Sequence, residues 1–331
     1  MAGFADSALA IAAIKSGGIG SLACAMLTPD QIAAEVAAVR VAYSGPLNLN
    51  FFCHTLGEAP DDTRWRATLA PFYALEGITP STNPLPLRRP FDATMAQVVE
   101  ATRPTIVSFH FGLPDDGLLG QVKASGALIF GNATSVAEAR ALADRGCDAI
   151  IAQGFEAGGH AGYFLQGHQP IGLFALLPQI VDAVTVPVIA AGGIGDARGV
   201  RAALALGAGA VQIGTAYLRT PEARTSMAHR KRLETASADD SVITNLFSGG
   251  LARGLCNRLT DGLGPVSKDA PGFPHASAAI SALRQHAEAD GRADYSPLWT
   301  GQGAHAPLCS AADLTQTLGA AALATKEPDD A

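Results

Sequence analysis

The chain has 331 residues, of which 48% are hydrophobic and 16% are charged, and its formal net charge is −7. This composition supplies a large core and excludes an intrinsically disordered protein. The acidic balance argues against a nucleic-acid-binding protein, which needs a basic face, and no apolar stretch reaches the ~20 residues that span a bilayer. The five cysteines are scattered without C-x-x-C spacing, which predicts free thiols in a cytoplasmic protein.

Along the chain, short apolar runs alternate with Ala-rich amphipathic segments, and a Gly-containing turn follows most runs. Most runs are apolar on both faces, which is typical of parallel strands covered by helices. The seven predicted strands are residues 19–23, 47–51, 105–109, 127–131, 148–152, 186–191 and 210–214.

The intervening helices carry recognisable start signals. Thr28 precedes a proline at the first helical position, and Asp196 is placed to cap the helix that follows it. Ser135 and Glu138 have the spacing of a capping box, in which each side chain bonds the other residue's backbone N–H.

Alternating strands and helices over this length predict a (β/α)₈ TIM barrel, but only seven of its eight strands are visible. The first visible element is a helix over residues 7–15, directly after the initial Met1. The first strand is therefore expected to be missing or truncated. Either another part of the chain supplies it or the true start lies upstream, and we favour the second explanation. Residues 1–221 are predicted to form the barrel and residues 222–310 a smaller, mostly helical addition over its mouth. A C-terminal helix and tail, residues 311–331, are expected to pack back on the barrel.

Two Gly-rich turns follow the last two strands, where a TIM barrel often binds phosphate. One turn contains Gly193, and the other contains Gly214 followed by Thr215. Glycine permits close approach of an anion, and the following helix N-terminus offers free N–H donors. These turns predict a phosphate site, the alternative being that the glycines only make tight turns. The G-x-G-x-x-G fingerprint of a Rossmann sheet is absent.

A second dense segment runs from Gln153, at the end of a strand, to His160 on a Gly-rich loop. A histidine in the barrel mouth is suited to act as a general base or to bind an anion. His110 also ends a strand and is a second candidate on the substrate side. We expect Glu156 to be solvated or to serve as a hydrogen-bonding partner in its loop. His54 has no partner at metal-ligand spacing, so no metal site is predicted.

Taken together, these segments resemble the nitronate monooxygenase family of FMN-dependent TIM-barrel enzymes. The most specific motif is Gln153-Gly-Phe-Glu-Ala-Gly-Gly-His160, supported by Ser108-Phe-His-Phe-Gly112 and Ala190-Ala-Gly-Gly-Ile-Gly195. The resemblance implies that His160 is the catalytic residue. It also implies a set of FMN contacts: Asn50, Gln153, Gly158, Gly193, Gln212, Ile213, Gly214 and Thr215. Family members usually carry a strand ending in Pro-Met-Ala-Gly, whereas this chain begins at that methionine.

The resemblance implies oxidation of alkyl nitronates by O₂ to a carbonyl compound and nitrite, through a flavin semiquinone. Detoxification of propionate 3-nitronate is the role that the family suggests. The expected partners are a small nitronate and O₂, with no nucleic acid and no membrane, and a homodimer is compatible with the sequence. As an imidazolium His160 could hold the nitronate, and as a neutral base it could deprotonate a nitroalkane.

Three other interpretations stay open at this point. A related FMN-dependent NAD(P)H reductase, of the enoyl-acyl-carrier-protein or quinone type, shares the fold and a Gly-Gly-His loop. A flavin-free barrel enzyme could bind a phosphate through the same two turns. A truncated chain could serve as a binding or scaffold protein, although the intact His160 loop argues against that.

Overall fold

The computed structural model describes residues 3–80, 87–165, 167–303 and 308–324. A seven-stranded parallel sheet forms its centre, in the order β1-β2-β3-β4-β5-β7-β8. All seven predicted strands are confirmed, with ends shifted by up to two residues. They are β1 (Gly20–Ala23), β2 (Leu47–Phe52), β3 (Ile106–His110), β4 (Leu128–Ala133), β5 (Ala149–Gln153), β7 (Val188–Ala191) and β8 (Ala210–Gln212).

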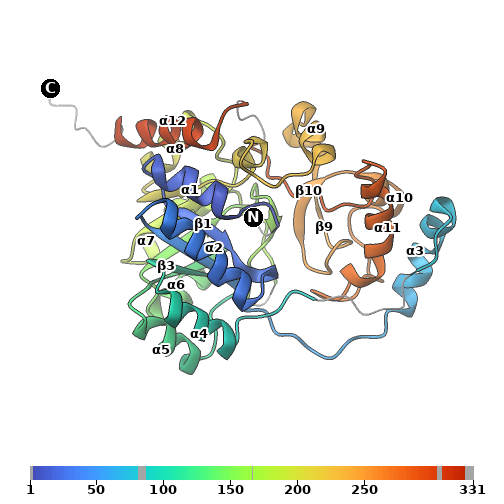
Figure 1. Cartoon of the computed structure of the whole chain (residues 1–331), viewed down its shortest axis with the longest axis horizontal. Coiled ribbons are helices and arrows are strands. Elements are labelled where there is room, and N and C mark those ends of the chain that lie inside the picture. The colour runs from blue at the N-terminus through green and yellow to red at the C-terminus, as the bar shows by residue number, and fades with distance from the viewer. Residues whose placement is uncertain (1–2, 81–86, 166, 304–307, 325–331) are drawn as a thin grey trace.

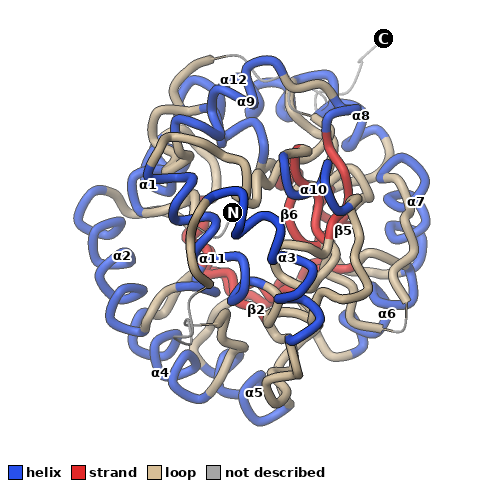
Figure 2. Tube along the Cα trace, turned by 90° about the vertical axis from the view of Figure 1, so that its right-hand side faces the viewer, coloured by secondary structure: helices blue, strands red, loops and turns tan. Residues whose placement is uncertain are grey.

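Helices surround the curled sheet, as Figure 2 shows, and their apolar faces build one large core with the strands. They are α1 (Ser7–Lys15), α2 (Pro29–Ala42), α4 (Ala93–Thr102), α5 (Asp116–Ala124), α6 (Val136–Asp144), α7 (Leu173–Ala183), α8 (Ala197–Ala205) and α12 (Ala311–Ala324). The described chain thus has the TIM-barrel architecture with one strand position open, between β8 and β1. Helix α12 packs on both α8 and α1, outside this opening. Met1, ahead of α1, and the predicted tail, residues 325–331, lie outside the described residues.

The predicted helix starts are confirmed, with one exception in detail. Thr28 accepts the backbone N–H of Gln31, and Asp196 accepts those of Arg198 and Gly199. Ser135 caps α6, but the expected return bond from Glu138 is absent among the described contacts. The Glu138 carboxylate instead accepts hydrogen bonds from Thr134 and from a loop that is distant in sequence.

A smaller lobe lies beside the barrel (Figure 1) and has its own apolar core. It contains α9 (Met227–Thr235), α10 (Arg258–Leu263), α11 (Ser277–Ala289) and a three-stranded sheet in the order β6-β10-β9. Its strands are β6 (Gly159–His160), β9 (Ser241–Thr244) and β10 (Ala252–Leu255). Elsewhere along the chain there are short 3₁₀ helices: η1 (Cys24–Met26), η2 (Thr215–Arg219) and η3 (Ala238–Asp240).

This lobe draws on two separate stretches of sequence, which the prediction for residues 222–310 did not foresee. Helix α3 (Thr63–Glu76), inserted after β2, packs against α11. Trp65 is fully buried there and donates its indole N–H to the Ala276 carbonyl at 3.1 Å, while the Tyr73 hydroxyl donates to Ala279 at 2.7 Å. Among the described residues, no helix is both long and apolar enough to cross a bilayer.

Candidate active site

Polar side chains form a hydrogen-bonded band across β1, β2 and β3, from Ser21 and Asn48 in the amino halves of their strands to Asn50 farther along β2. The Asn48 amide donates to the hydroxyls of Ser21 and Ser108 at 3.0 and 2.9 Å, and the Asn50 amide donates to Ser108 at 2.8 Å. These contacts follow from the parallel register, which places Asn50 opposite Ser108. The Asn48 side-chain oxygen is buried without a hydrogen-bond partner in the described structure, so this band retains a free acceptor.

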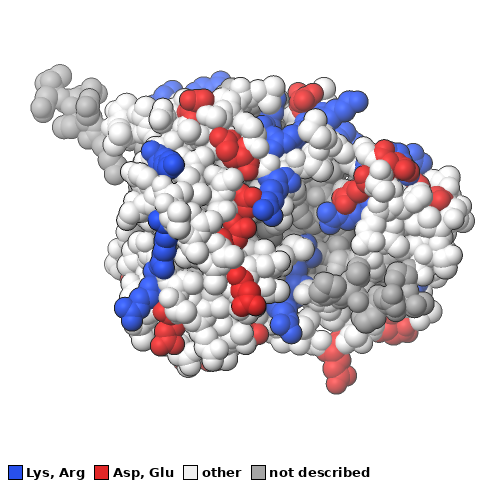
Figure 3. Space-filling model, in the orientation of Figure 1, with Lys and Arg blue, Asp and Glu red and all other residues white. Residues whose placement is uncertain are grey.

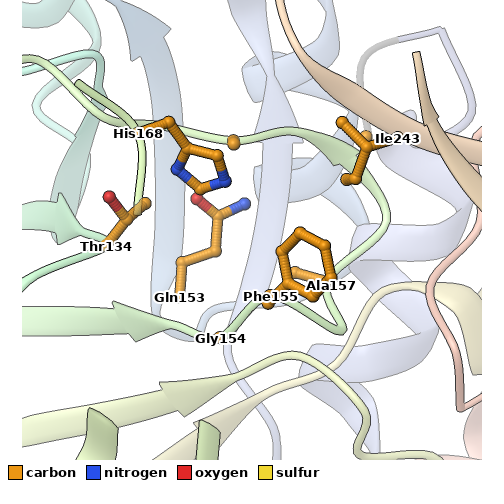
Figure 4. A pocket seen from close by; sticks show the side chains of 9 residues that line it. Thr134, Gln153, Gly154, Phe155, Ala157, His168 and Ile243 are labelled. Carbon is orange, nitrogen blue, oxygen red and sulfur yellow. The ribbon is translucent and has the colours of Figure 1, made fainter. Parts of the chain in front are cut away.

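Gln153, at the end of β5, connects this edge of the sheet to the His160 loop. Its oxygen accepts from the Asn132 amide at 3.0 Å and from the Gly162 N–H at 2.8 Å, and its amide nitrogen donates to the His160 carbonyl at 2.9 Å. Figure 4 shows Gln153 beside His168, between Thr134 and Phe155. All side-chain polar atoms of Gln153 therefore take part in fixing the backbone around His160.

His160 lies on β6, which pairs with β10 of the smaller lobe. Its ring is buried, and Nε2 lies 2.8 Å from the hydroxyl of buried Ser248. Burial lowers the pKa of His160 well below its usual value of 6.5, and the positive charge of Arg88 lowers it further. The imidazole is consequently neutral at pH 7, which suits a base and argues against the imidazolium form allowed by the sequence alone.

His110 ends β3, and its Nε2 lies 3.2 Å from the same His160 carbonyl that Gln153 contacts. Since a carbonyl only accepts, His110 must carry its proton on Nε2. His110 and Gln153 thus hold the His160 backbone from two strands. The role of His110 on the substrate side stays a prediction.

Acid is expected to destabilise the protein through two histidines that the fold keeps neutral. Burial lowers the pKa of both His110 and His229 to about 4 from the usual 6.5. The unfolded chain therefore binds protons first, and stability that is present above pH 6.5 is lost as the pH falls toward 4. Each histidine should lower the free energy of unfolding by about 2 kcal/mol between pH 7 and pH 5.

Urea unfolding at several pH values measures this loss. In wild type the Phe4 ring centre lies 5.5 Å from that of His229, and the His229→Phe variant keeps a ring there. Its free energy of unfolding should depend less steeply on pH, because one protonation site is lost. A free energy of unfolding that does not change between pH 7 and pH 5 would contradict these pKa directions.

A cavity of about 260 Å³ opens beside His160, and we call it the mouth pocket. The Phe273 ring centre lies 5.0 Å from that of His160 and 4.8 Å from that of His54. No sequence motif points to Phe273, which lies in a Pro-rich turn far along the chain from the barrel motifs. The pocket is lined by Cys53, His54, Thr55, Phe111, Ala161, Tyr163, Phe164, Gly250, Leu251 and Phe273.

The two Gly-rich turns lie side by side, because β7 and β8 are paired with Ala191 opposite Gln212. Gly193 has φ +68°, a conformation that L side chains rarely adopt. The backbone N–H groups of Gly193, Gly214 and Thr215 donate to no acceptor within the described ranges. The Thr215 hydroxyl accepts the Gly301 N–H at 2.7 Å. These turns therefore present free donors at one edge of the sheet.

Gly158, by contrast, faces other backbone. A Cβ at this position would lie 2.4 Å from the Gly301 nitrogen, so glycine is required here for close packing of two loops. Glu156 accepts the N–H of Leu173 at 2.9 Å and so caps α7, which confirms its expected role as a hydrogen-bonding partner. Buried Arg253 stacks on Phe155 at 4.5 Å and donates to the Phe155 carbonyl at 3.0 Å. These contacts brace the loop between Gln153 and His160.

Comparison with known proteins identifies the family. Residues 1–320 match the model of the nitronate monooxygenase family. Nitronate monooxygenase of Pseudomonas aeruginosa is 38% identical over 326 residues, covering 96% of this chain and 93% of that protein. The enzyme of the same name from Paraburkholderia phytofirmans is 37% identical over 311 residues, covering 92% and 85%.

Solved structures agree with this result. A nitroalkane oxidase from Streptomyces ansochromogenes superimposes with a TM-score of 0.89 at 34% identity, covering 98% of this chain and 94% of that one. FabK from Thermotoga maritima, with a TM-score of 0.75 at 23% identity over 98% and 91% of the two chains, shares the fold. The chain therefore belongs to the nitronate monooxygenase family, a family of flavin-dependent oxidoreductases that act on nitro compounds.

Proposed function

We propose that this protein uses FMN and O₂ to oxidise alkyl nitronates, such as propionate 3-nitronate, to a carbonyl compound and nitrite. The observation that carries the proposal is the neutral, buried His160 beside the mouth pocket, in a chain of this family. The reaction releases one nitrite for each nitronate consumed, and its second product is the aldehyde or ketone formed at the same carbon.

The residues at the carboxyl edge of the sheet fit FMN. The free N–H groups of Gly193, Gly214 and Thr215 are suited to its phosphate, together with the neighbouring Gln212 and Ile213. Asn50 and Gln153, near the carboxyl ends of β2 and β5, offer amide groups to a flavin ring. Gly158, which packs against the Gly301 backbone, stays an FMN contact predicted from the family resemblance alone. Bound FMN would accept electrons from the nitronate and return them to O₂.

His160 is assigned the removal of the α-proton when the substrate is a neutral nitroalkane. The Ser248 hydroxyl can donate a hydrogen bond to the Gly250 carbonyl, 3.4 Å away. Its oxygen then accepts a hydrogen bond from the Nε2–H of His160. That tautomer leaves a lone pair on Nδ1, which forms no hydrogen bond with any described residue. Nδ1 is therefore the proposed base atom, and Ser248 fixes the tautomer.

A combined oxygen-electrode and nitrite assay on the purified, FMN-loaded protein tests this function. We expect O₂ consumption and one nitrite per nitronate, with no requirement for NADH or NADPH. Oxidation of NAD(P)H with a quinone or an enoyl thioester, and no nitrite from any nitronate, would instead support a reductase.

A further inference from the structure

Beside the mouth pocket lies a cation that the proposed reaction does not use. The backbone carbonyl of Arg88 lies 3.1 Å from Nε2 of His54, which lines the pocket. The guanidinium carbon of Arg88 lies 5.9 Å from the centre of the Phe273 ring. The His160 ring centre lies 5.0 Å from the centre of the same Phe273 ring. Phe273 is therefore in contact distance of both the proposed base and Arg88.

Arg88 has no carboxylate partner among the described residues. The other arginines in this lobe, such as Arg284 and Arg292, pair with glutamates at 2.7 and 2.6 Å. The charged and titratable groups that act on Arg88, His54 and His160 are Arg284, His275 and His110, and none of them is an acid. In a protein with a net charge of −7, Arg88 is therefore a cation that no acid among the described residues offsets.

The Arg88 guanidinium stays charged although its partly buried surroundings disfavour the charged form. Burial lowers the pKa of Arg88 to about 10, which still leaves it protonated at neutral pH. A partly desolvated cation without a counter-ion is costly, and an anion from solution would relieve that cost. In Figure 3, Lys and Arg side chains lie along the hollow between the two lobes, with Asp and Glu side chains at its rims.

We propose that Arg88 is a specificity-determining residue that binds a carboxylate on the far end of the substrate from the nitronate group. This inference rests on the proposed function, because it places the nitronate end of the substrate at His160 and the carboxylate end of the same molecule at Arg88. Aromatic Phe111 and Phe273 would pack along the short carbon chain between the two anionic groups. The fork of Arg88 matches a carboxylate better than the point charge of a lysine.

The first test compares two nitronates that differ only at the far end, those of 3-nitropropionate and 1-nitropropane. In the FMN-loaded Arg88→Gln variant, we expect KM for the carboxylated substrate to rise about 10- to 100-fold, with kcat little changed. KM for propyl nitronate should stay near the wild-type value. Arg88→Lys should restore part of the loss, and Arg89→Gln, at the exposed neighbouring residue, should have no effect.

The second test measures binding without chemistry. Succinate, whose second carboxylate mimics the planar nitronate, should bind the wild type more tightly than butyrate does, and Arg88→Gln should remove the difference. Equal losses on both nitronates, or unchanged succinate binding in Arg88→Gln, would overturn the assignment of Arg88. Failure of the wild type to release nitrite from either nitronate would overturn the proposed function, while succinate binding would still decide the role of Arg88.

Discussion

Replacing His160 with asparagine should lower turnover of neutral nitroalkanes by about 10²- to 10⁴-fold, the usual contribution of a positioned base. Preformed nitronates should be affected far less, because they have already lost the α-proton. The neutral state of the buried imidazole at pH 7 is the physical reason for this asymmetry. The measurement is kcat/KM for one nitroalkane and for its nitronate, each with wild type and variant.

His168→Asn is a matched control, since His168 belongs to the same connection between β6 and α7. Its ring stacks on Tyr163, with ring centres 5.1 Å apart, and its ring contacts among the described residues include neither Phe273 nor His160. We expect this variant to retain the wild-type ratio of the two activities. Equal losses on nitroalkane and nitronate in His160→Asn would refute the role of His160 as a base.

Replacing Glu138 with alanine should lower the free energy of unfolding by about 3–5 kcal/mol. Its buried carboxylate accepts from the backbone N–H and the hydroxyl of Thr134 at 2.7 and 2.8 Å. Its other oxygen accepts from the N–H groups of Phe164 and Leu165 at 2.7 and 3.2 Å. Alanine would leave four donors without their partner, two of them on buried Thr134.

Urea unfolding at pH 7 measures this effect, with Glu100→Ala on an exposed face of α4 as the control. Glu138→Gln should lie between the two, because an amide keeps one acceptor oxygen but turns a donor toward donors. A loss below about 1 kcal/mol in Glu138→Ala would mean that these four groups find other partners, and it would contradict the account of this loop.

Much of the barrel could be predicted because its signals are local. Each parallel strand is covered on both sides, so it appears as a continuous apolar run, and helices such as α2, α6 and α8 begin at their own capping side chain. The pairing of the Gly193 and Thr215 turns also follows from strand order, since neighbouring parallel strands end at the same edge. The family motif around His160 then placed the loop at the barrel mouth.

The smaller lobe and the pocket wall could not be predicted in this way, because they depend on contacts between distant segments. Trp65 joins α3 to α11 across more than two hundred residues, and no local pattern announces that contact. Phe273 reaches His160 from a turn without periodicity. Glu138 has capping-box spacing, yet two loop amides and Thr134 compete successfully for its carboxylate. Arg88 has no motif of its own, and its unpaired charge depends on which described side chains the fold brings near it.

Electrons should enter this protein from a nitronate and leave to O₂, and an anaerobic visible absorption spectrum tests this route most directly. The purified protein should carry or take up FMN. Its flavin absorption should change when a nitronate is added without O₂, and recover when O₂ is admitted. NADH and NADPH alone should leave the spectrum unchanged. Bleaching by NAD(P)H without nitronate, or a colourless protein that cannot take up FMN, would contradict the account.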